Sequence, residues 1–103
     1  MIKGFKMFLR PGKEAEYKAR HDAIWPEMKE MIHNYGGKNY TIFLDRETNT
    51  LFAYIELESA EKWSKTAETA ICQKWRVYMS DLLETNPDNS PVSAPLVQMF
   101  HLD

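Results

Sequence analysis

The most informative stretch of the chain reads Tyr17-Lys18-Ala19-Arg20-His21-Asp22-Ala23-Ile24-Trp25-Pro26. Read as a helix, this stretch and its continuation place one side chain per turn on a single face. The members of that face are Tyr17, His21, Ile24, Met28, Met31 and Tyr35. All of them are apolar or aromatic except His21, which is therefore either a buried, hydrogen-bonded core histidine or a functional group.

Pro26 interrupts the helix that this pattern predicts between about residues 13 and 35. Proline lacks an N–H donor, and its ring clashes with the preceding helical turn. We therefore expect a kink or a restart at residues 22–25, which puts His21 in the last turn of the first segment. The negative end of that segment favours a protonated imidazole, whereas burial favours the neutral form.

Alternating apolar residues predict strands around this helix, at residues 2–9, 39–44, 50–58 and 96–102. Ser59 is a suitable N-cap for a second helix, which the threonine-rich residues 66–69 interrupt. Its apolar stripe consists of Ile71, Cys72, Trp75, Tyr78, Met79, Leu82 and Leu83. The polar segment 86–91 contains two prolines and two asparagines and is expected to be a loop, either a connector or a cover over a pocket.

The predicted order of elements is β-α-β-β-α-β, the ferredoxin-like α+β arrangement. It implies a four-stranded antiparallel sheet with both helices on one face. The other face would then carry exposed aromatic side chains, and we expect a second copy of the chain to cover it in a homodimer. At 103 residues the chain is long enough for one core and too short for two, so residues 1–103 are expected to form one domain.

Composition indicates an ordinary soluble protein, with 44% hydrophobic and 27% charged residues. The 13 basic and 15 acidic residues are interspersed, which argues against nucleic acid or a membrane surface as a partner. The chain has neither a signal-peptide pattern nor a run of about 20 apolar residues. Cys72 is the only cysteine, so we expect an intracellular, cytoplasmic protein without disulfides.

No motif supports metal, nucleotide or thiol chemistry, and we expect no cofactor. The histidines His21, His33 and His101 lack metal-ligand spacing, and Cys72 lies in a stripe of core type. A phosphate-binding glycine loop and a nucleophile elbow are both missing from the sequence. Acid–base chemistry remains, with His21 as the proton carrier because its ordinary pKa lies near neutral pH.

Four further residues are candidates for a site around His21. Tyr17 lies one turn before it and Tyr40 on a strand face with Ile42 and Leu44, so each tyrosine either binds substrate or packs in the core. The pattern around Trp75 is that of a core residue, although an indole also provides a flat surface for a sugar ring. Arg76 lies one residue outside the stripe, where a solvated arginine is the default.

Several motifs recur together in one known family. They are Tyr17 with Arg20-His21, Ile24-Trp25-Pro26-Glu27, Asn39-Tyr40, Cys72-Gln73-Lys74-Trp75, Tyr78-Met79 and Asn86-Pro87-Asp88-Asn89-Ser90-Pro91-Val92-Ser93. With these motifs the chain resembles the L-rhamnose mutarotase family essentially from end to end. The resemblance implies a cytoplasmic homodimer of the dimeric α/β-barrel type. It also implies a cofactor-free isomerase that interconverts the α and β anomers of L-rhamnopyranose.

The resemblance also implies roles for individual residues. His21 looks like the family's proton donor, Tyr17 and Tyr40 match its substrate-binding tyrosines, and Trp75 matches the first of a tryptophan pair that lines the sugar site. The second of that pair is Arg76 here, so one wall of the pocket departs from the family's pattern.

Other interpretations stay open at this point. The second proton carrier is a tyrosine, Asp88 or an ordered water molecule. A non-catalytic dimeric ferredoxin-like protein that binds a small ligand would show the same pattern of elements. A ferredoxin-like monooxygenase or isomerase of aromatic substrates is a third and weaker interpretation.

Overall fold

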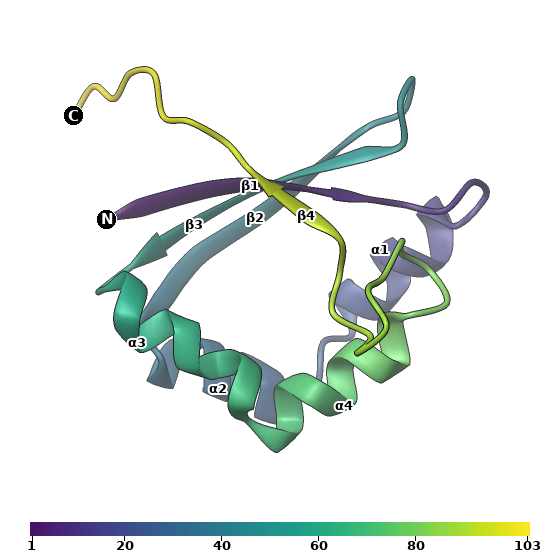
Figure 1. The fold of residues 1–103 in the computed structure, drawn as a ribbon, viewed down its shortest axis with the longest axis horizontal. Helices are drawn as coiled ribbons and strands as arrows, with labels where there is room; N and C mark the ends of the chain where they lie inside the picture. The colour runs from purple at the N-terminus through teal and green to yellow at the C-terminus, as the bar shows by residue number, and fades with distance from the viewer.

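The computed structural model describes all 103 residues. Its elements are β1 (Ile2–Phe8), α1 (Glu14–Asp22), α2 (Pro26–Asn34), β2 (Gly37–Asp45), β3 (Thr50–Leu57), α3 (Ala60–Ser64), the 3₁₀ turn η1 (Lys65–Glu68), α4 (Ala70–Met79) and β4 (Ser93–Pro95). The strands pair antiparallel in the order β2-β3-β1-β4, and the helices lie on one side of the sheet (Figure 1). The predicted ferredoxin-like α+β fold is confirmed.

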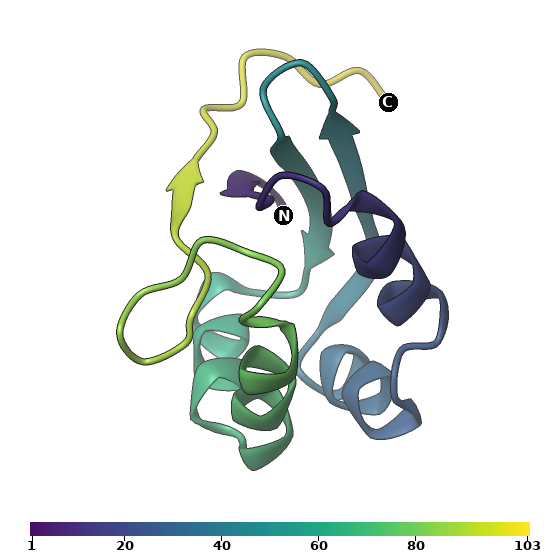
Figure 2. The same cartoon turned by 90° about the vertical axis from the view of Figure 1, so that its right-hand side faces the viewer.

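The helix break at Pro26 is also confirmed. A residue before proline is excluded from helical geometry, and Trp25 is extended with φ −60° and ψ 134°. Pro26 is the first residue of α2, a position where its missing N–H costs nothing. Figure 2 shows α1 and α2 as separate helices joined by a short connection. His21 consequently lies in the last turn of α1.

The second helical region follows the predicted pattern of caps. The Ser59 hydroxyl accepts a hydrogen bond from the Lys62 N–H at 3.1 Å and starts α3. The expected threonine-rich interruption is η1, and Thr69 then caps α4 by accepting from the Cys72 N–H at 3.3 Å. Because α4 starts at this cap, Trp75 and Met79 face the sheet and are buried.

The core fills the space between the sheet and the helices. Its strand side consists of the predicted alternating residues, among them Met7, Leu51 and Ala53. Its helix side comes from α1, α2 and α4 and includes Met28, Met31, Cys72, Trp75 and Met79. Leu51 and Leu82 are almost fully buried.

The prediction of a last strand at residues 96–102 is wrong. β4 covers Ser93–Pro95 and pairs with β1. The Leu96 N–H adds one more bond, to the Gly4 carbonyl at 3.0 Å, and residues 97–103 then leave the sheet without regular structure. Pro95 has no N–H to donate, and the apolar side chains beyond it find no surface of this chain to pack on. Val97, Met99, Phe100 and Leu102 are 79–88% exposed.

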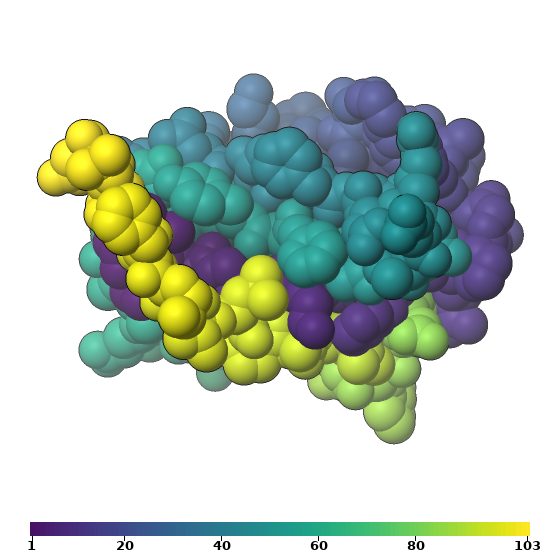
Figure 3. Space-filling view, turned by 90° about the horizontal axis from the view of Figure 1, so that it is seen from above, coloured from purple at the N-terminus to yellow at the C-terminus, as the bar shows by residue number.

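The face of the sheet opposite the helices is open and aromatic, as predicted. Phe43 is 66% and Tyr54 37% exposed there, and Phe8 and Phe52 are half-buried beside them. Figure 3 views this face, with the C-terminal segment along one side of it. The homodimer that would cover this face stays a prediction. None of the helices has the length and apolar character needed to cross a bilayer.

Candidate active site

A cavity of about 1180 Å³ lies between the sheet and the helices. Side chains from the inner face of the sheet, from α1, α2 and α4, and from the loop after α4 line it. All the predicted site residues are among them, namely His21, Tyr17, Tyr40, Trp75 and Arg76. The fold therefore brings into one cavity residues that lie up to 59 positions apart in the sequence (Tyr17 to Arg76).

His21 has one ring nitrogen held by the backbone of its own helix. Its Nδ1 lies 3.1 Å from the Tyr17 carbonyl oxygen, and because a carbonyl only accepts, Nδ1 carries the proton in this contact. The neutral ring then has its free lone pair on Nε2. Burial lowers the pKa of His21, against the opposing effects of the Tyr17 carbonyl and the Asp22 charge. The favoured form is therefore a neutral imidazole with a basic Nε2.

The two tyrosines stay protonated. Tyr17 is 8% exposed and its ring centroid lies 4.3 Å from that of His21. Burial raises the pKa of Tyr17 well above its usual value, and the nearby Tyr40 raises it further. Tyr40 keeps 36% of its surface accessible, and burial of the rest raises its pKa to about 12. Both phenols are neutral at physiological pH and are able to donate a hydrogen bond to a bound ligand.

An aromatic cluster extends from His21 toward α4. The Trp75 ring is perpendicular to the imidazole, with centroids 5.5 Å apart. Trp25 packs edge-on against Trp75 at 5.1 Å, and Tyr78 lies 5.1 Å from Trp25 and 5.7 Å from Trp75. Trp75 is thus both a core residue and part of the cavity wall, so the two interpretations of its sequence pattern are compatible.

Arg76 is half-buried and lines the cavity, which differs from the solvated arginine that its sequence position alone suggested. Asn89 and Pro91 of the loop after α4 line the cavity as well, so this loop forms part of the cavity wall. Asp88 does not belong to the lining. Hydrogen bonds from the Ser90 hydroxyl and N–H lower its pKa, with a smaller contribution from Arg76.

The remaining titratable candidates are poorly suited to this chemistry, although Cys72 and His33 also line the cavity. Burial raises the pKa of the Cys72 thiol, which makes it a poor nucleophile at neutral pH. His33 and His101 are exposed. No group of three or more potential ligand side chains is placed to hold a metal ion.

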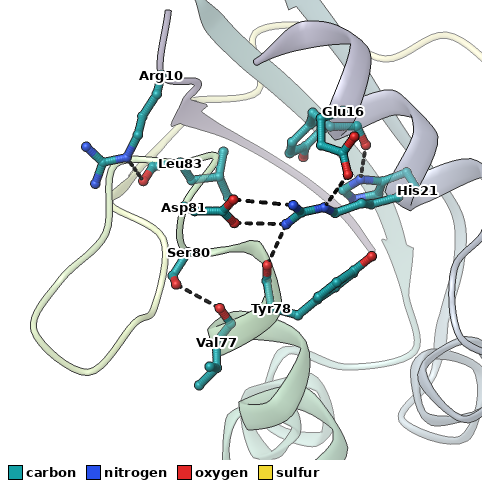
Figure 4. A network of polar contacts seen from close by, with 10 residues as sticks. Arg10, Glu16, His21, Val77, Tyr78, Ser80, Asp81 and Leu83 are labelled. Carbon is teal, nitrogen blue, oxygen red and sulfur yellow. Dashed lines mark hydrogen bonds and ion pairs between the residues drawn. The ribbon is translucent and has the colours of Figure 1, made fainter. Parts of the chain in front are cut away.

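Three residues around His21 are not among the predicted site residues. Trp25 and Tyr78 occur in the family motifs, and the structure shows that they complete the aromatic cluster. The motifs also include Arg20, with no role assigned to it. It binds Glu16 at 2.9 Å and Asp81 at 2.8 Å (Figure 4). The spacing of Glu16 and Arg20 suggests a helical ion pair, but no local pattern predicts the contact with Asp81.

Comparison with known proteins identifies the family. The family model described as L-rhamnose mutarotase matches residues 3–102. An L-rhamnose mutarotase of Lachnoclostridium phytofermentans is 66% identical over 98% of this chain and 97% of its own length. One of Listeria monocytogenes is 54% identical over 93% of this chain and 92% of its own length.

Solved structures agree with the sequence relatives. The crystal structure of an L-rhamnose mutarotase from Formosa agariphila superposes with a TM-score of 0.92 at 42% identity, covering 100% of this chain and 99% of that one. A candidate antibiotic biosynthesis monooxygenase from Bordetella bronchiseptica reaches a TM-score of 0.70 at 15% identity, which shows a shared fold and nothing more. Because the family model spans nearly the whole sequence and the relatives are more than half identical, the chain belongs to the L-rhamnose mutarotase family.

Proposed function

We propose that this chain is an L-rhamnose mutarotase, an isomerase of the aldose 1-epimerase type that interconverts the α and β anomers of L-rhamnopyranose. The observation that carries the proposal is the placement of His21, whose Nδ1 donates to the Tyr17 carbonyl oxygen at 3.1 Å. Its Nε2 is thereby left basic in a cavity that also contains two neutral phenols and an indole. Family membership supplies the substrate class.

The chemistry requires two proton transfers and no redox step. The anomeric hydroxyl loses its proton, the ring oxygen gains one, and the C1–O5 bond breaks to give the open-chain aldehyde. After rotation about the C1–C2 bond, O5 attacks the other face of the aldehyde, and the reverse proton transfers close the ring as the other anomer. Because burial favours neutral His21, Nε2 accepts the anomeric proton during opening and donates it during closure.

The other residues bind and orient the sugar in this proposal. The phenols of Tyr17 and Tyr40 hydrogen-bond to sugar oxygens, and one of them or a water molecule protonates the ring oxygen. The Trp75 indole packs against the C–H face of the ring. Arg76, which also lines the cavity, donates hydrogen bonds to sugar hydroxyl groups at the position where the family has a second tryptophan.

The setting of the enzyme is also part of the proposal. Residues 1–103 act as one domain and function as a homodimer through the open face of the sheet. The buried, unpaired Cys72 suits the reducing cytoplasm.

Exchange between the two anomers of L-rhamnose, followed by NMR of the anomeric protons, tests the proposal. Wild type is expected to accelerate exchange well above the spontaneous rate. His21→Gln preserves approximate shape but has no titratable nitrogen, so we expect it to lose about 10²-fold or more of that acceleration. His101→Gln is the matched control, because His101 is exposed on the C-terminal segment, and it should keep wild-type exchange.

Two outcomes would contradict the proposal in different ways. Full acceleration by folded His21→Gln would remove His21 from the mechanism. Absence of acceleration by wild type, combined with saturable quenching of tryptophan fluorescence by the sugar, would favour the non-catalytic ligand-binding alternative.

A further inference from the structure

We propose that Arg20 is a positioning residue that holds His21 of α1 in register with the aromatic wall of α4. This inference rests on the proposed function, since it assigns a part in the same site to a residue that does not itself line the cavity. Arg20 is adjacent to His21 in the sequence, and its side chain is only 14% exposed. By contrast, the side chains of both of its carboxylate partners are more than half exposed.

The guanidinium of Arg20 donates hydrogen bonds from each of its nitrogen atoms. Nε donates to Glu16 Oε1 at 2.9 Å. Nη1 donates to the Tyr78 carbonyl at 2.6 Å and to Asp81 Oδ1 at 2.8 Å, and Nη2 donates to Asp81 Oδ2 at 3.3 Å. The guanidinium carbon also lies 4.5 Å from the centroid of the Tyr78 ring. Figure 4 labels the three partners Glu16, Tyr78 and Asp81 and marks these hydrogen bonds as dashed lines.

Two partners of Arg20 lie at the C-terminal end of α4: Tyr78 is in its last turn and Asp81 comes just after it, whereas Glu16 is on α1. The last carbonyls of a helix lack intrahelical partners, and a cation is favoured at that end. Arg20 satisfies one of them, at Tyr78, and fixes the Tyr78 ring from one side. Tyr78 contacts Trp25 and Trp75 on its other sides, and Trp75 is perpendicular to the His21 ring.

These contacts close a loop of interactions through the site. Arg20 precedes His21 in α1 and contacts Tyr78 of α4. Tyr78 contacts Trp75, and Trp75 packs against the imidazole of His21. The α1 and α4 backbones pack only weakly against each other, and Arg20 donates the side-chain hydrogen bond that joins these two helices, at the Tyr78 carbonyl. A displacement of Arg20 should therefore let the His21 ring move relative to the wall on which the sugar packs.

A purely structural ion pair would behave differently from a positioning residue. It would lower the melting temperature when removed but leave the turnover of the remaining folded enzyme unchanged. Orientation is more demanding, because misplacement by about 1 Å can cost about 10²-fold in rate. The experiment therefore has to separate turnover from folding.

Arg20→Lys keeps the cation but loses the fork and the stacking on Tyr78. We expect kcat for anomer exchange of L-rhamnose, measured well below the melting temperature, to fall about tenfold, with KM within about twofold of wild type. In ¹H–¹⁵N spectra of the His21 ring, we expect separate Nδ1 and Nε2 signals for wild type and averaged signals for the variant. Asp81→Asn removes only one charged partner and should lower kcat less, about threefold.

Arg10→Lys is the matched control. Arg10 is also an arginine that donates to a backbone carbonyl just beyond α4, at Leu83 with 2.8 Å, but its side chain points away from Tyr78 (Figure 4). This control should keep both kcat and the His21 ring signals.

The inference is overturned if folded Arg20→Lys keeps kcat within twofold of wild type with unchanged ring signals. Failure of both Arg20→Lys and Asp81→Asn to fold would also overturn it, in favour of a structural role. If wild type does not accelerate exchange at all, the proposed function fails, and the His21 ring signals alone then decide whether Arg20 positions the imidazole.

Discussion

At the scale of single residues, His21 owes its properties to a short list of neighbours. The Tyr17 carbonyl selects the tautomer, and burial selects the neutral form. The Tyr17 carbonyl and Asp22 oppose burial, but burial is the largest effect on the pKa of His21. An imidazole that rests in its basic form is suited to accept a proton from a hydroxyl and return it.

The lowered pKa of His21 predicts a specific dependence on pH. In the folded state the pKa lies below the ordinary value of 6.5, so between the two values the unfolded chain binds more protons. Acidification through the window below 6.5 therefore destabilises the fold, and above 6.5 the contribution is constant. We expect the melting temperature of wild type to fall more than that of His21→Gln between about pH 7 and about pH 5.

Differential scanning calorimetry of the two proteins over this range measures the effect, and carboxylate titrations common to both cancel in the difference. Exchange catalysed by wild type should also decline on the acid side with a midpoint below 6.5. Equal changes in melting temperature for the two proteins across this pH range would contradict the assignment of a lowered pKa to His21.

At the scale of elements, the turn between α2 and β2 decides where Tyr40 stands. Gly36 has φ +83°, the left-handed conformation that ends a helix and favours glycine. Gly37 follows without room for a side chain: an added Cβ would lie 2.7 Å from the Trp63 ring, 3.0 Å from Ile32 and 3.1 Å from Ile55. The Trp63 ring in turn packs 6.4 Å from that of Tyr40, so this turn supports one wall of the cavity.

Gly37→Ala is accordingly expected to destabilise the protein by about 1–3 kcal/mol, because the ring and both isoleucines would have to move. KM for the sugar should rise as Tyr40 shifts with Trp63. Gly4→Ala is the control, since its Cβ would meet neighbours at 3.6 Å, an ordinary contact, and its stability should stay within about 0.5 kcal/mol. Equal melting temperatures for the two variants would show that Trp63 adapts without cost.

At the scale of the whole molecule, two apolar features lack a partner within the chain. One is the open face with Phe43 and Tyr54, and the other is the C-terminal segment with Met99 and Phe100. Contiguous exposed apolar surface of this kind usually marks an interface. Both features lie on the side of the sheet away from the helices (Figures 1 and 3), so a second copy could cover them together while leaving the cavity between sheet and helices separate.

We therefore predict a dimer in sedimentation equilibrium. Phe43→Lys places a charge on the open face and should shift the protein toward monomer. Val77→Lys is the control, because Val77 is similarly exposed at 59% but lies on α4, and it should leave the association state unchanged. A wild-type monomer at the concentrations of the assay would refute this interface.

The sequence alone determined the order of elements, the break at Pro26, the cap at Ser59, the strand faces and the residues Tyr17, His21, Tyr40, Trp75 and Arg76 that line the cavity. These features depend on neighbours within a few residues, or on family motifs that keep their spacing, and both are visible along one chain. The apolar alternation after Pro95 was misleading for the same reason, because alternation records what a strand needs from its side chains but not whether a partner strand is present.

Only the tertiary structure decided which residues surround His21. Trp25 and Tyr78 join the cluster through packing between helices, and Arg20 meets Asp81 across 61 positions of sequence. Burial likewise decided the protonation of His21, since the desolvation that lowers its pKa comes from elements folded around it. Such long-range contacts arise from how faces pack together, and local periodicity carries no information about them.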